Sequence, residues 1–184
     1  MTAMTSKDAA LAEFRRRVPD ADPRLHGFLG AWLDARGDAL VPRRTSFSPM
    51  SIPSLLRFIW IYVLDPERQD FVCELAGESV NDVWGGSIRG RTIREVVGEV
   101  DYPLVRGRWD AIIGQPAIQY GAMNEPLTSL ETWQAERLLL PMASRDGTVN
   151  VMLGISLYKL QYRPLKAASD VPEMVIRIPC ADLV

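Results

Sequence analysis

Histidine is nearly absent from this sequence, and that scarcity limits the chemistry available to the chain. His26 is the only histidine among 184 residues, whereas His-pair metal sites need two and catalytic dyads and triads need one beside a nucleophile. The motifs GxSxG and HExxH and the phosphate-binding loop ending in GK[ST] are absent too. His26 lies beside the apolar stripe of an expected helix, where packing or a surface position is its usual role. We therefore expect a protein that is not an enzyme and holds no metal.

Cysteine and long apolar runs are also scarce. Cys73 and Cys180 are the only cysteines, and neither has a CxxC or Cys/His neighbour, which argues against both a disulfide framework and a zinc site. No apolar run reaches the length of a signal peptide or a membrane span. These absences predict a cytoplasmic protein without a membrane span.

Neither sign of charge dominates the sequence. Its 21 Lys and Arg residues nearly balance its 23 Asp and Glu residues, which gives a formal net charge of −2. Nucleic-acid binders usually carry a broad basic surface, so we expect no nucleic-acid partner. What the chain does contain is apolar residues, 47% by composition, and these are enough to bury a core in one domain of this length.

An amphipathic helix is expected between Asp22, which can cap its start, and Arg36. Pro23 suits the first helical position because proline has no N–H to leave unpaired there. One apolar stripe at helical spacing consists of Leu25, Phe28, Leu29, Trp32 and Leu33. The preceding segment, residues 7–17, has few apolar residues on one side, and we expect it to be a frayed or partner-dependent helix.

Strands are predicted before and after a helical segment in the middle of the sequence. Residues 58–64 (FIWIYVL) are apolar in both alternate sets, which is typical of a strand covered on both faces. Residues 70–75 follow as the returning strand of a hairpin, and residues 102–113 have mostly helical spacing. Three more strand candidates follow at residues 117–123, 133–142 and 149–160. This order predicts an α+β fold with one five-stranded antiparallel sheet and short helices on one face.

The order of several segments resembles the PAS domain. An amphipathic helix ends in "ARG", and then follow "SPMSIPSLLRFIWIYVLD", "FVCELAGESVNDVWGGSIRGRTIREVV" and "LLLPMASRDGTVNVMLGISLY". Over residues 25–160 the pattern is similar to that of the small bacterial PAS proteins common in alphaproteobacteria. The connector departs from that family, since it contains Phe47-Ser48-Pro49 where an acidic residue and a proline are expected.

The resemblance divides the chain into four parts. Residues 1–37 form an N-terminal helical extension, residues 38–54 a proline-rich connector, and residues 55–160 the PAS-like domain. Residues 161–184 are a C-terminal tail, in which the sequence MVIRIP either adds an edge strand or stays mobile.

The resemblance also implies a core that can hold a ligand. In PAS-like folds, short helices after the second strand cross the concave face of the sheet and enclose this core. Gly85, Gly86 and Gly90 fit the corners of such a wrap because glycine accepts positive φ. The residues expected to line the core are Phe71, Trp84, Ile88, Ile93, Trp109, Tyr120, Trp133, Leu153 and Ile155. The alternative is that these large side chains fill the core and leave no room for a ligand.

Three arginines cluster in the same segment, namely Arg89, Arg91 and Arg94. Together with Arg106 and Arg108, they either contact an anionic ligand or an acidic partner, or pair with the nearby carboxylates of Glu95, Glu99 and Asp101.

The resemblance leaves the cofactor unknown and disfavours two candidates. Haem is disfavoured because the only histidine, His26, belongs to the N-terminal helix. A flavin photosensor is disfavoured because flavin-photoreceptor PAS domains keep a reactive cysteine in a helical motif, whereas Cys73 lies in an expected strand.

We expect a sensory or signalling module that acts by protein–protein interaction on an unknown signalling partner and binds a small ligand in its core. The strands that are apolar on both faces need a cover on the side away from the short helices. The stripe of residues 25–33 either supplies that cover within the chain or crosses to a second copy in a homodimer, as N-terminal helices of PAS-like domains often do. The alternatives are a small α+β enzyme or carrier with an apolar cavity, and a ligand-free scaffold protein.

Overall fold

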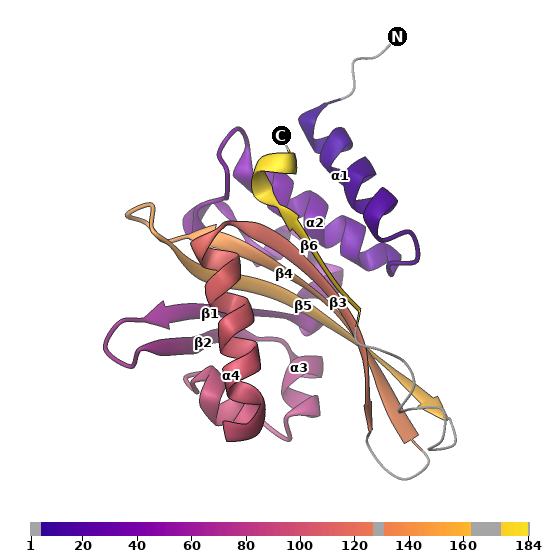
Figure 1. The fold of residues 1–184 in the computed structure, drawn as a ribbon, viewed down its shortest axis with the longest axis vertical. Coiled ribbons are helices and arrows are strands. Elements are labelled where there is room, and N and C mark those ends of the chain that lie inside the picture. Colours follow the sequence, from indigo (N-terminus) through magenta and orange to yellow (C-terminus); the bar gives the residue numbers. More distant parts are fainter. Residues whose placement is uncertain (1–4, 127–130, 163–173, 184) are drawn as a thin grey trace.

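The sheet at the centre of the molecule has helices on both faces (Figure 1). This computed structural model describes residues 5–126, 131–162 and 174–183. The helices are α1 (Ser6–Arg17), α2 (Pro23–Arg36), α3 (Glu78–Val83) and α4 (Ile93–Gly114), with short 3₁₀ turns η1 (Arg44–Ser46), η2 (Pro49–Ser51), η3 (Pro53–Phe58) and η4 (Cys180–Leu183). The strands are β1 (Ile59–Asp65), β2 (Asp70–Ala76), β3 (Ala117–Pro126), β4 (Glu131–Ala143), β5 (Val149–Tyr162) and β6 (Met174–Pro179).

The described strands form one antiparallel sheet in the order β2-β1-β5-β4-β3-β6. The predicted α+β fold with an antiparallel sheet is confirmed, but the sheet has six described strands rather than five. The additional strand is β6, the MVIRIP segment, which pairs with β3. The edge-strand alternative for this segment is therefore the one observed. Ile178, at 1% exposure, anchors the strand in the core, and such burial stabilises a short terminal strand.

The outer face of the sheet is covered by α1 and α2 of the same chain (Figure 1). The apolar stripe of α2 lies in this core, and each of its side chains is at most 4% exposed: Leu25, Phe28, Leu29, Trp32 and Leu33. Trp32 also donates from Nε1 to the backbone oxygen of Pro141 in β4, at 3.0 Å. Of the two alternatives for the stripe, the structure therefore has the cover within the chain.

Helix α1 is complete rather than frayed. It begins with a capping box in which Thr5 and Asp8 exchange hydrogen bonds, and such a box satisfies backbone donors that a helix start otherwise leaves unpaired. Phe14 is fully buried and meets the rings of His26 and Tyr120 at centroid distances of 5.5 and 6.4 Å. The expectation of a frayed helix is not met because Phe14 gains long-range contacts that the local pattern does not reveal.

The concave face of the sheet is crossed by α3 and α4. Thr92 caps α4, and the predicted helix over residues 102–113 lies within it. A kink interrupts α4 at Gly98, where φ is 80°. The corners expected at Gly85, Gly86 and Gly90 have φ of 73°, 153° and 80°, a region that favours glycine. The glycines at this point of the sequence therefore turn the chain between short helices.

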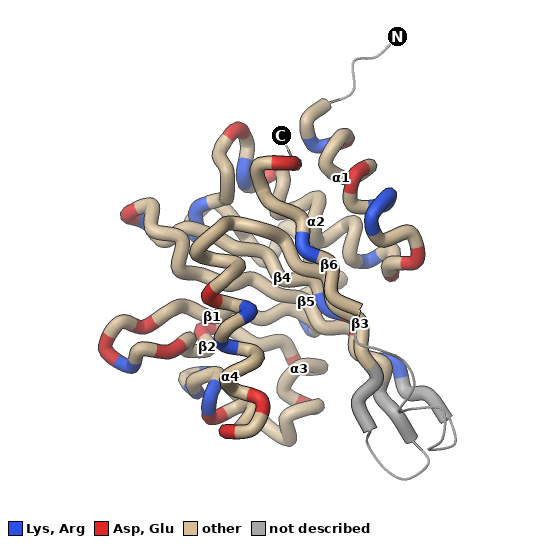
Figure 2. The backbone as a smooth tube through the Cα atoms, viewed as in Figure 1, with Lys and Arg blue, Asp and Glu red and all other residues tan. Residues whose placement is uncertain are grey.

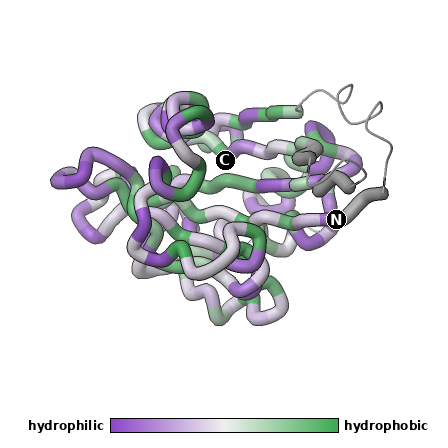
Figure 3. The backbone as a smooth tube through the Cα atoms, turned by 90° about the horizontal axis from the view of Figure 1, so that it is seen from below, coloured by the Kyte–Doolittle hydropathy of each residue, from purple (hydrophilic) through white to green (hydrophobic). Residues whose placement is uncertain are grey.

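Charge and hydropathy can be followed along the backbone. Hydrophilic residues are prominent in the outer loops (Figure 3), and residues of both charge signs are dispersed over the molecule (Figure 2). The dispersed charge agrees with the small net charge of the sequence.

Candidate functional site

A cleft of about 430 Å³ opens between the concave face of the sheet and helices α3 and α4. Its apolar lining includes Val80, Trp84, Ile88, Ile93, Val96, Val97, Leu104, Val105, Leu139 and Val175. Its polar lining consists of Asp101, Arg108, Gln119, Arg137, Ser156 and Tyr158. A concave site with apolar walls and a few convergent polar groups is the usual form of a small-molecule site.

An aromatic cluster occupies part of the space beneath α4. Trp109 of α4 stacks on Trp60 of β1, with ring centroids 5.2 Å apart and planes inclined by 6°. Tyr62 and Phe71 meet Trp109 edge to face, at centroid distances of 5.1 and 5.0 Å. Packed aromatic rings exclude a ligand from the space that they fill. Trp60, Tyr62 and Trp109 also line the cleft, so these rings form part of its wall, and the open volume extends from them to residues of β3, β4 and β6.

Gly154 allows this aromatic cluster to lie flat on the sheet. It stands opposite Trp60 in the pairing of β5 with β1, and a Cβ built on Gly154 would lie 2.0 Å from Cζ2 of Trp60. The missing side chain thus provides the room for the indole ring. The next residue on this side, Ser156, accepts a hydrogen bond from Nε1 of Trp60 at 2.9 Å, which fixes the ring in its plane.

Polar side chains from β3, β4 and β5 meet on the sheet side of the cleft. Arg137 contacts the sulfur of Met123 at 3.3 Å and the hydroxyl of Tyr158 at 3.5 Å, and its guanidinium lies 5.5 Å from the centroid of the Tyr158 ring. Gln119 accepts from Arg177 at 2.8 Å. These contacts hold the polar groups in place beside an apolar wall.

The residues predicted to line the ligand core lie on both faces of the sheet, and only some of them line the cleft. Four of them line the cleft, namely Trp84, Ile88, Ile93 and Trp109. Phe71 is fully buried behind Trp109 rather than at the cleft surface. The side chain of Trp133 lies outside the residues that the structure describes.

Tyr120, Leu153 and Ile155 belong to the opposite face. All three lie in the core beneath α1 and α2, because successive side chains of a strand alternate between faces and Gly154 and Ser156 take the cleft side of β5. Their assignment to the ligand core is therefore corrected. The more apolar set of β5 meets the apolar stripe of α2, and the mixed set faces the cleft.

The three clustered arginines do not converge on the cleft, and none belongs to its described lining. Arg94 forms an ion pair with Glu99 at 2.8 Å, Arg91 donates to the backbone oxygen of Glu95, and Arg89 is exposed. For Arg91 and Arg94 the geometry favours local pairing over an anion site, and exposed pairs of this kind contribute little to stability.

Sequence reasoning missed Gln119, Arg137, Ser156 and Tyr158. A usable signal was present in β5, where Ser156 and Tyr158 interrupt an otherwise apolar segment that needs cover on both faces. Polar residues on a covered strand need partners, and here those partners come from neighbouring strands and from Trp60. The cleft position of Arg137 depends on the register of β4, which the sequence does not reveal.

The two cysteines are buried and free. Burial raises the pKa of the Cys73 thiol to about 11 and that of Cys180 to about 12. Because the thiolate is the reactive form, we expect both to resist a chromogenic thiol reagent at pH 8 in the native protein and to react rapidly after denaturation. Fast modification of either cysteine before unfolding would contradict the buried positions.

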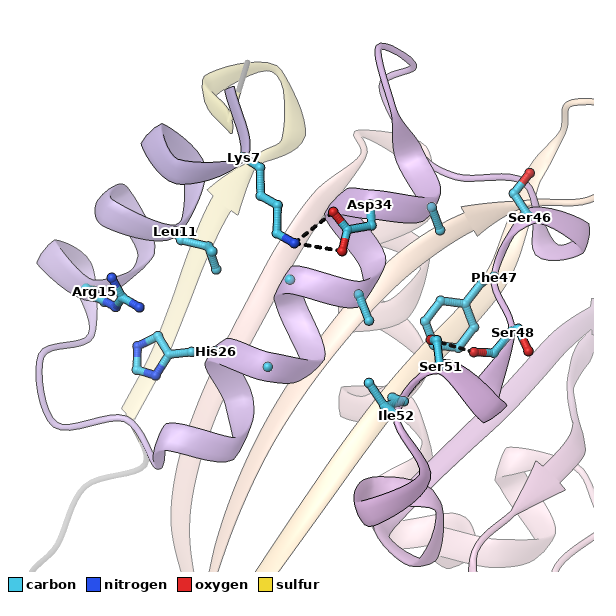
Figure 4. A pocket seen from close by; sticks show the side chains of 14 residues that line it. Lys7, Leu11, Arg15, His26, Asp34, Ser46, Phe47, Ser48, Ser51 and Ile52 are labelled. Atoms are coloured by element: carbon cyan, nitrogen blue, oxygen red, sulfur yellow. Dashed lines mark hydrogen bonds and ion pairs between the residues drawn. The ribbon is translucent and has the colours of Figure 1, made fainter. Parts of the chain in front are cut away.

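A second hollow, a groove of about 620 Å³, lies on the outer side between α1, α2 and the turns η1 and η2 (Figure 4). Lys7 and Asp34 face each other across it, with Nζ to carboxylate distances of 2.7 and 2.6 Å. His26 also lines it, and burial, followed by the charge of Arg15, lowers the pKa of its imidazole. We assign the candidate site to the cleft because polar and apolar groups converge there, whereas the facing charges of this groove already pair with each other.

Within the described ranges, no group of three or more His, Cys, Asp or Glu side chains is placed to hold a metal ion. Helices long and apolar enough to cross a membrane are likewise not found among the described residues.

Comparison with known proteins places these observations in a family. Residues 22–157 match the family model described as "PAS domain". Among solved structures, the chain is similar to one described as "Flavin Analogue Sheds Light on Light-Oxygen-Voltage Domain Mechanism", with 13% identity over 60% of this chain and 82% of that chain and a TM-score of 0.44. It is also similar to the LOV domain of a blue-light activated histidine kinase from Erythrobacter litoralis, with 18% identity over 56% of this chain and 96% of that chain and a TM-score of 0.40. No curated protein matches the sequence.

Proposed function

The chain belongs to the PAS domain family, and from this premise we propose that it is a non-enzymatic sensory module that binds a small molecule in the cleft and signals by contact with another protein. The observation that carries the proposal is the convergence of Arg137, Ser156 and Tyr158 at the floor of a cleft whose walls are apolar. Such a site orients an organic molecule by its polar end while its apolar body is removed from water.

The charges of the cleft favour a ligand with an anionic or hydrogen-bond-accepting end. Arg108 and Arg137 belong to the described lining, and both also interact within the chain. Arginine presents several donors in a planar fork that suits carboxylate and phosphate groups. The filled space beneath α4 limits the ligand to the outer part of the cleft, so a cofactor as large as haem does not fit the proposal.

Flavin photochemistry through a cysteine adduct is not part of the proposal. Residues 77–115, which form α3, α4 and their connection, contain no cysteine, and the Cys73 thiol in β2 donates to the backbone oxygen of Leu75 at 3.4 Å. The enzyme alternative would need a nucleophile with an adjacent base. Ser156, the serine that lines the cleft, is instead engaged by the indole of Trp60.

Gly121→Leu tests occupation of the cleft. Gly121 lines the cleft, and the nearest described atom to a Cβ built there is the backbone oxygen of Met174 at 3.8 Å, so leucine fits the strand and extends into the open volume. In native mass spectrometry of protein purified from cell extract, we expect a stoichiometric small molecule on the wild type and its loss from Gly121→Leu.

Gly107→Leu is the matched control, because Gly107 is an exposed position of α4 with no described atom beyond its own stretch of helix within 4 Å of a built Cβ. It should retain the bound mass. A wild type that carries no small molecule under gentle ionisation would favour the scaffold alternative. Equal retention by Gly121→Leu would place the ligand elsewhere.

A further inference from the structure

The apolar stripe of α2 packs against its own sheet, so a surface for a second copy is sought elsewhere on the molecule. The apolar stripe of α2 is buried within the chain, so it has no apolar area left to offer to a partner. Among the described strands, β6 is at one edge of the sheet and β2 at the other. Unpaired strand edges readily pair with further strands, so the two edges need separate consideration.

The β2 edge is covered by its own chain. Cys73 donates its backbone N–H to the oxygen of Arg91 at 2.9 Å and accepts from the N–H of Gly90 at 2.8 Å. Val72 also forms an isolated antiparallel bridge with Thr92. The segment before α4 therefore blocks this edge.

The β6 edge is exposed in the part of the chain that the structure describes. No described strand lies beyond β6 in the sheet, Met174 is 52% exposed and Val175 is 38% exposed. The two side chains are successive in the strand and therefore point to opposite faces of the sheet, so apolar area is exposed on both sides of this edge. The charge of the strand is confined to Arg177, whose guanidinium is held by Gln119 of the neighbouring strand at 2.8 Å.

Hydrogen-bond alternation shows which backbone groups face outward. Cys180 donates its N–H to the oxygen of Pro116 at 2.8 Å, one step beyond the registered pair Ala117 and Pro179. In an antiparallel ladder, hydrogen-bonded pairs alternate with non-hydrogen-bonded ones. The groups that point away from β3 are therefore those of Val175, Arg177 and Pro179. A proline at an outward position agrees with this assignment, since it has no N–H to donate.

We propose that two copies of this chain pair antiparallel through the outer edges of β6, around a two-fold axis at Ile176, and so form one continuous sheet. In this register Val175 of each copy lies opposite Arg177 of the other, and their outward N–H and C=O groups bond to each other. The register satisfies outward backbone groups of both strands at once, as a symmetric strand pair requires.

The charge of Arg177 favours this register over the one shifted to an axis at Arg177. An axis at Arg177 would place the two Arg177 side chains directly opposite each other, and like charges in that position are destabilising. An axis at Ile176 instead places each arginine beside an apolar side chain. Because Val175 lines the cleft, Arg177 of the second copy would then lie at the rim of the cleft, and the cleft of one copy would be completed by the other.

Sizing chromatography with light scattering on the full chain tests the pairing. We expect a dimeric wild type and a Val175→Pro variant whose dimer dissociation constant is raised by at least about tenfold, since proline removes an outward N–H from each copy and none from the β3–β6 ladder. Val175→Thr keeps the N–H and is the matched control, which should remain dimeric. A monomeric wild type, including one that captures a strand of another protein, overturns the proposal, as does a Val175→Pro variant that dimerises as tightly as wild type.

Cysteine cross-linking tests the register of the proposed β6–β6 pair. It gives a clear result even if Val175→Pro does not fold. Non-hydrogen-bonded partners have Cα atoms about 4.5 Å apart, within the range of a disulfide. Mild oxidation of Ile176→Cys should therefore give a covalent dimer on a non-reducing gel, and Arg177→Cys should not. Absence of the covalent dimer from Ile176→Cys, or an equal yield from Arg177→Cys, overturns the proposed axis. These outcomes do not depend on ligand binding and stay separate from the test of the proposed function.

Discussion

Gly154→Ala should lower the free energy of unfolding by about 3 kcal/mol or more, because overpacking at this position has no cheap relief. The added Cβ would lie 2.0 Å from Cζ2 and 2.2 Å from Cε2 of Trp60. The indole cannot move away, since Trp109 stacks on it and Ser156 holds its Nε1. Chemical denaturation followed by circular dichroism measures the loss as a lower midpoint with an unchanged slope.

The matched control is Gly107→Ala, the same substitution where no described atom beyond its own stretch of helix lies within 4 Å of the new Cβ. Alanine there should stabilise the helix by about 0.5 to 1 kcal/mol, since it reduces the freedom of the unfolded chain. Trp60→Leu in the Gly154→Ala background supplies the coupling test. If the loss comes from this contact, the double variant is more stable than the sum of the single effects predicts. Additive losses would show that Gly154 matters for another reason.

Gly154 and Trp60 also determine what the cleft can accept. The ring lies on the floor of the sheet because β5 has no side chain beneath it, and this arrangement fills part of the interior with an indole pair. The remaining open volume is bounded by this pair and by polar residues that include Arg137 and Tyr158. The same two residues therefore contribute to stability and to the size limit on a ligand.

The sequence was sufficient for the architecture because the relevant patterns are local. Strands that are apolar on both faces, such as residues 58–64, need a packed layer on each side of the sheet. The helix that carries the apolar stripe of residues 25–33 provides one of these layers. Glycines at residues 85, 86 and 90 indicated corners, and all three have positive φ. Helix periodicity and turn chemistry are properties of neighbouring residues, so they can be read without knowledge of the register.

The site was harder to predict because it depends on which face of each strand meets which layer. For β5, both alternate sets were candidates for the cleft, and apolar character pointed to Leu153 and Ile155 rather than to Ser156. The sequence does not show which layer packs against which face of β5. In the structure, α2 packs against the more apolar set of side chains. The fate of the MVIRIP segment was open for a similar reason, because pairing with β3 is a contact between segments far apart in sequence.

Trp32→Ala should lower the free energy of unfolding by about 3 to 5 kcal/mol, the cost of a large cavity in a packed core. Trp32 is fully buried between α2 and the sheet, and its loss would also leave the oxygen of Pro141 without the indole N–H that now donates to it at 3.0 Å. Trp84→Ala makes the same change at a side chain that is 39% exposed, so it should cost about 1 kcal/mol or less.

Deletion of residues 1–36 extends this argument from one side chain to the whole layer. It would expose the apolar residues of β4 and β5 that now lie beneath α1 and α2, among them Leu138, Leu140 and Leu153, each 0% exposed. A sheet with one bare apolar face aggregates, so we expect the truncated chain to appear in the insoluble fraction and Trp32→Ala to remain soluble with a lower midpoint. A soluble truncated chain with a cooperative unfolding transition near that of the full chain would mean that the outer face does not need its helical cover. It would also mean that the packing of Trp32 on the sheet is not required for the sheet to fold.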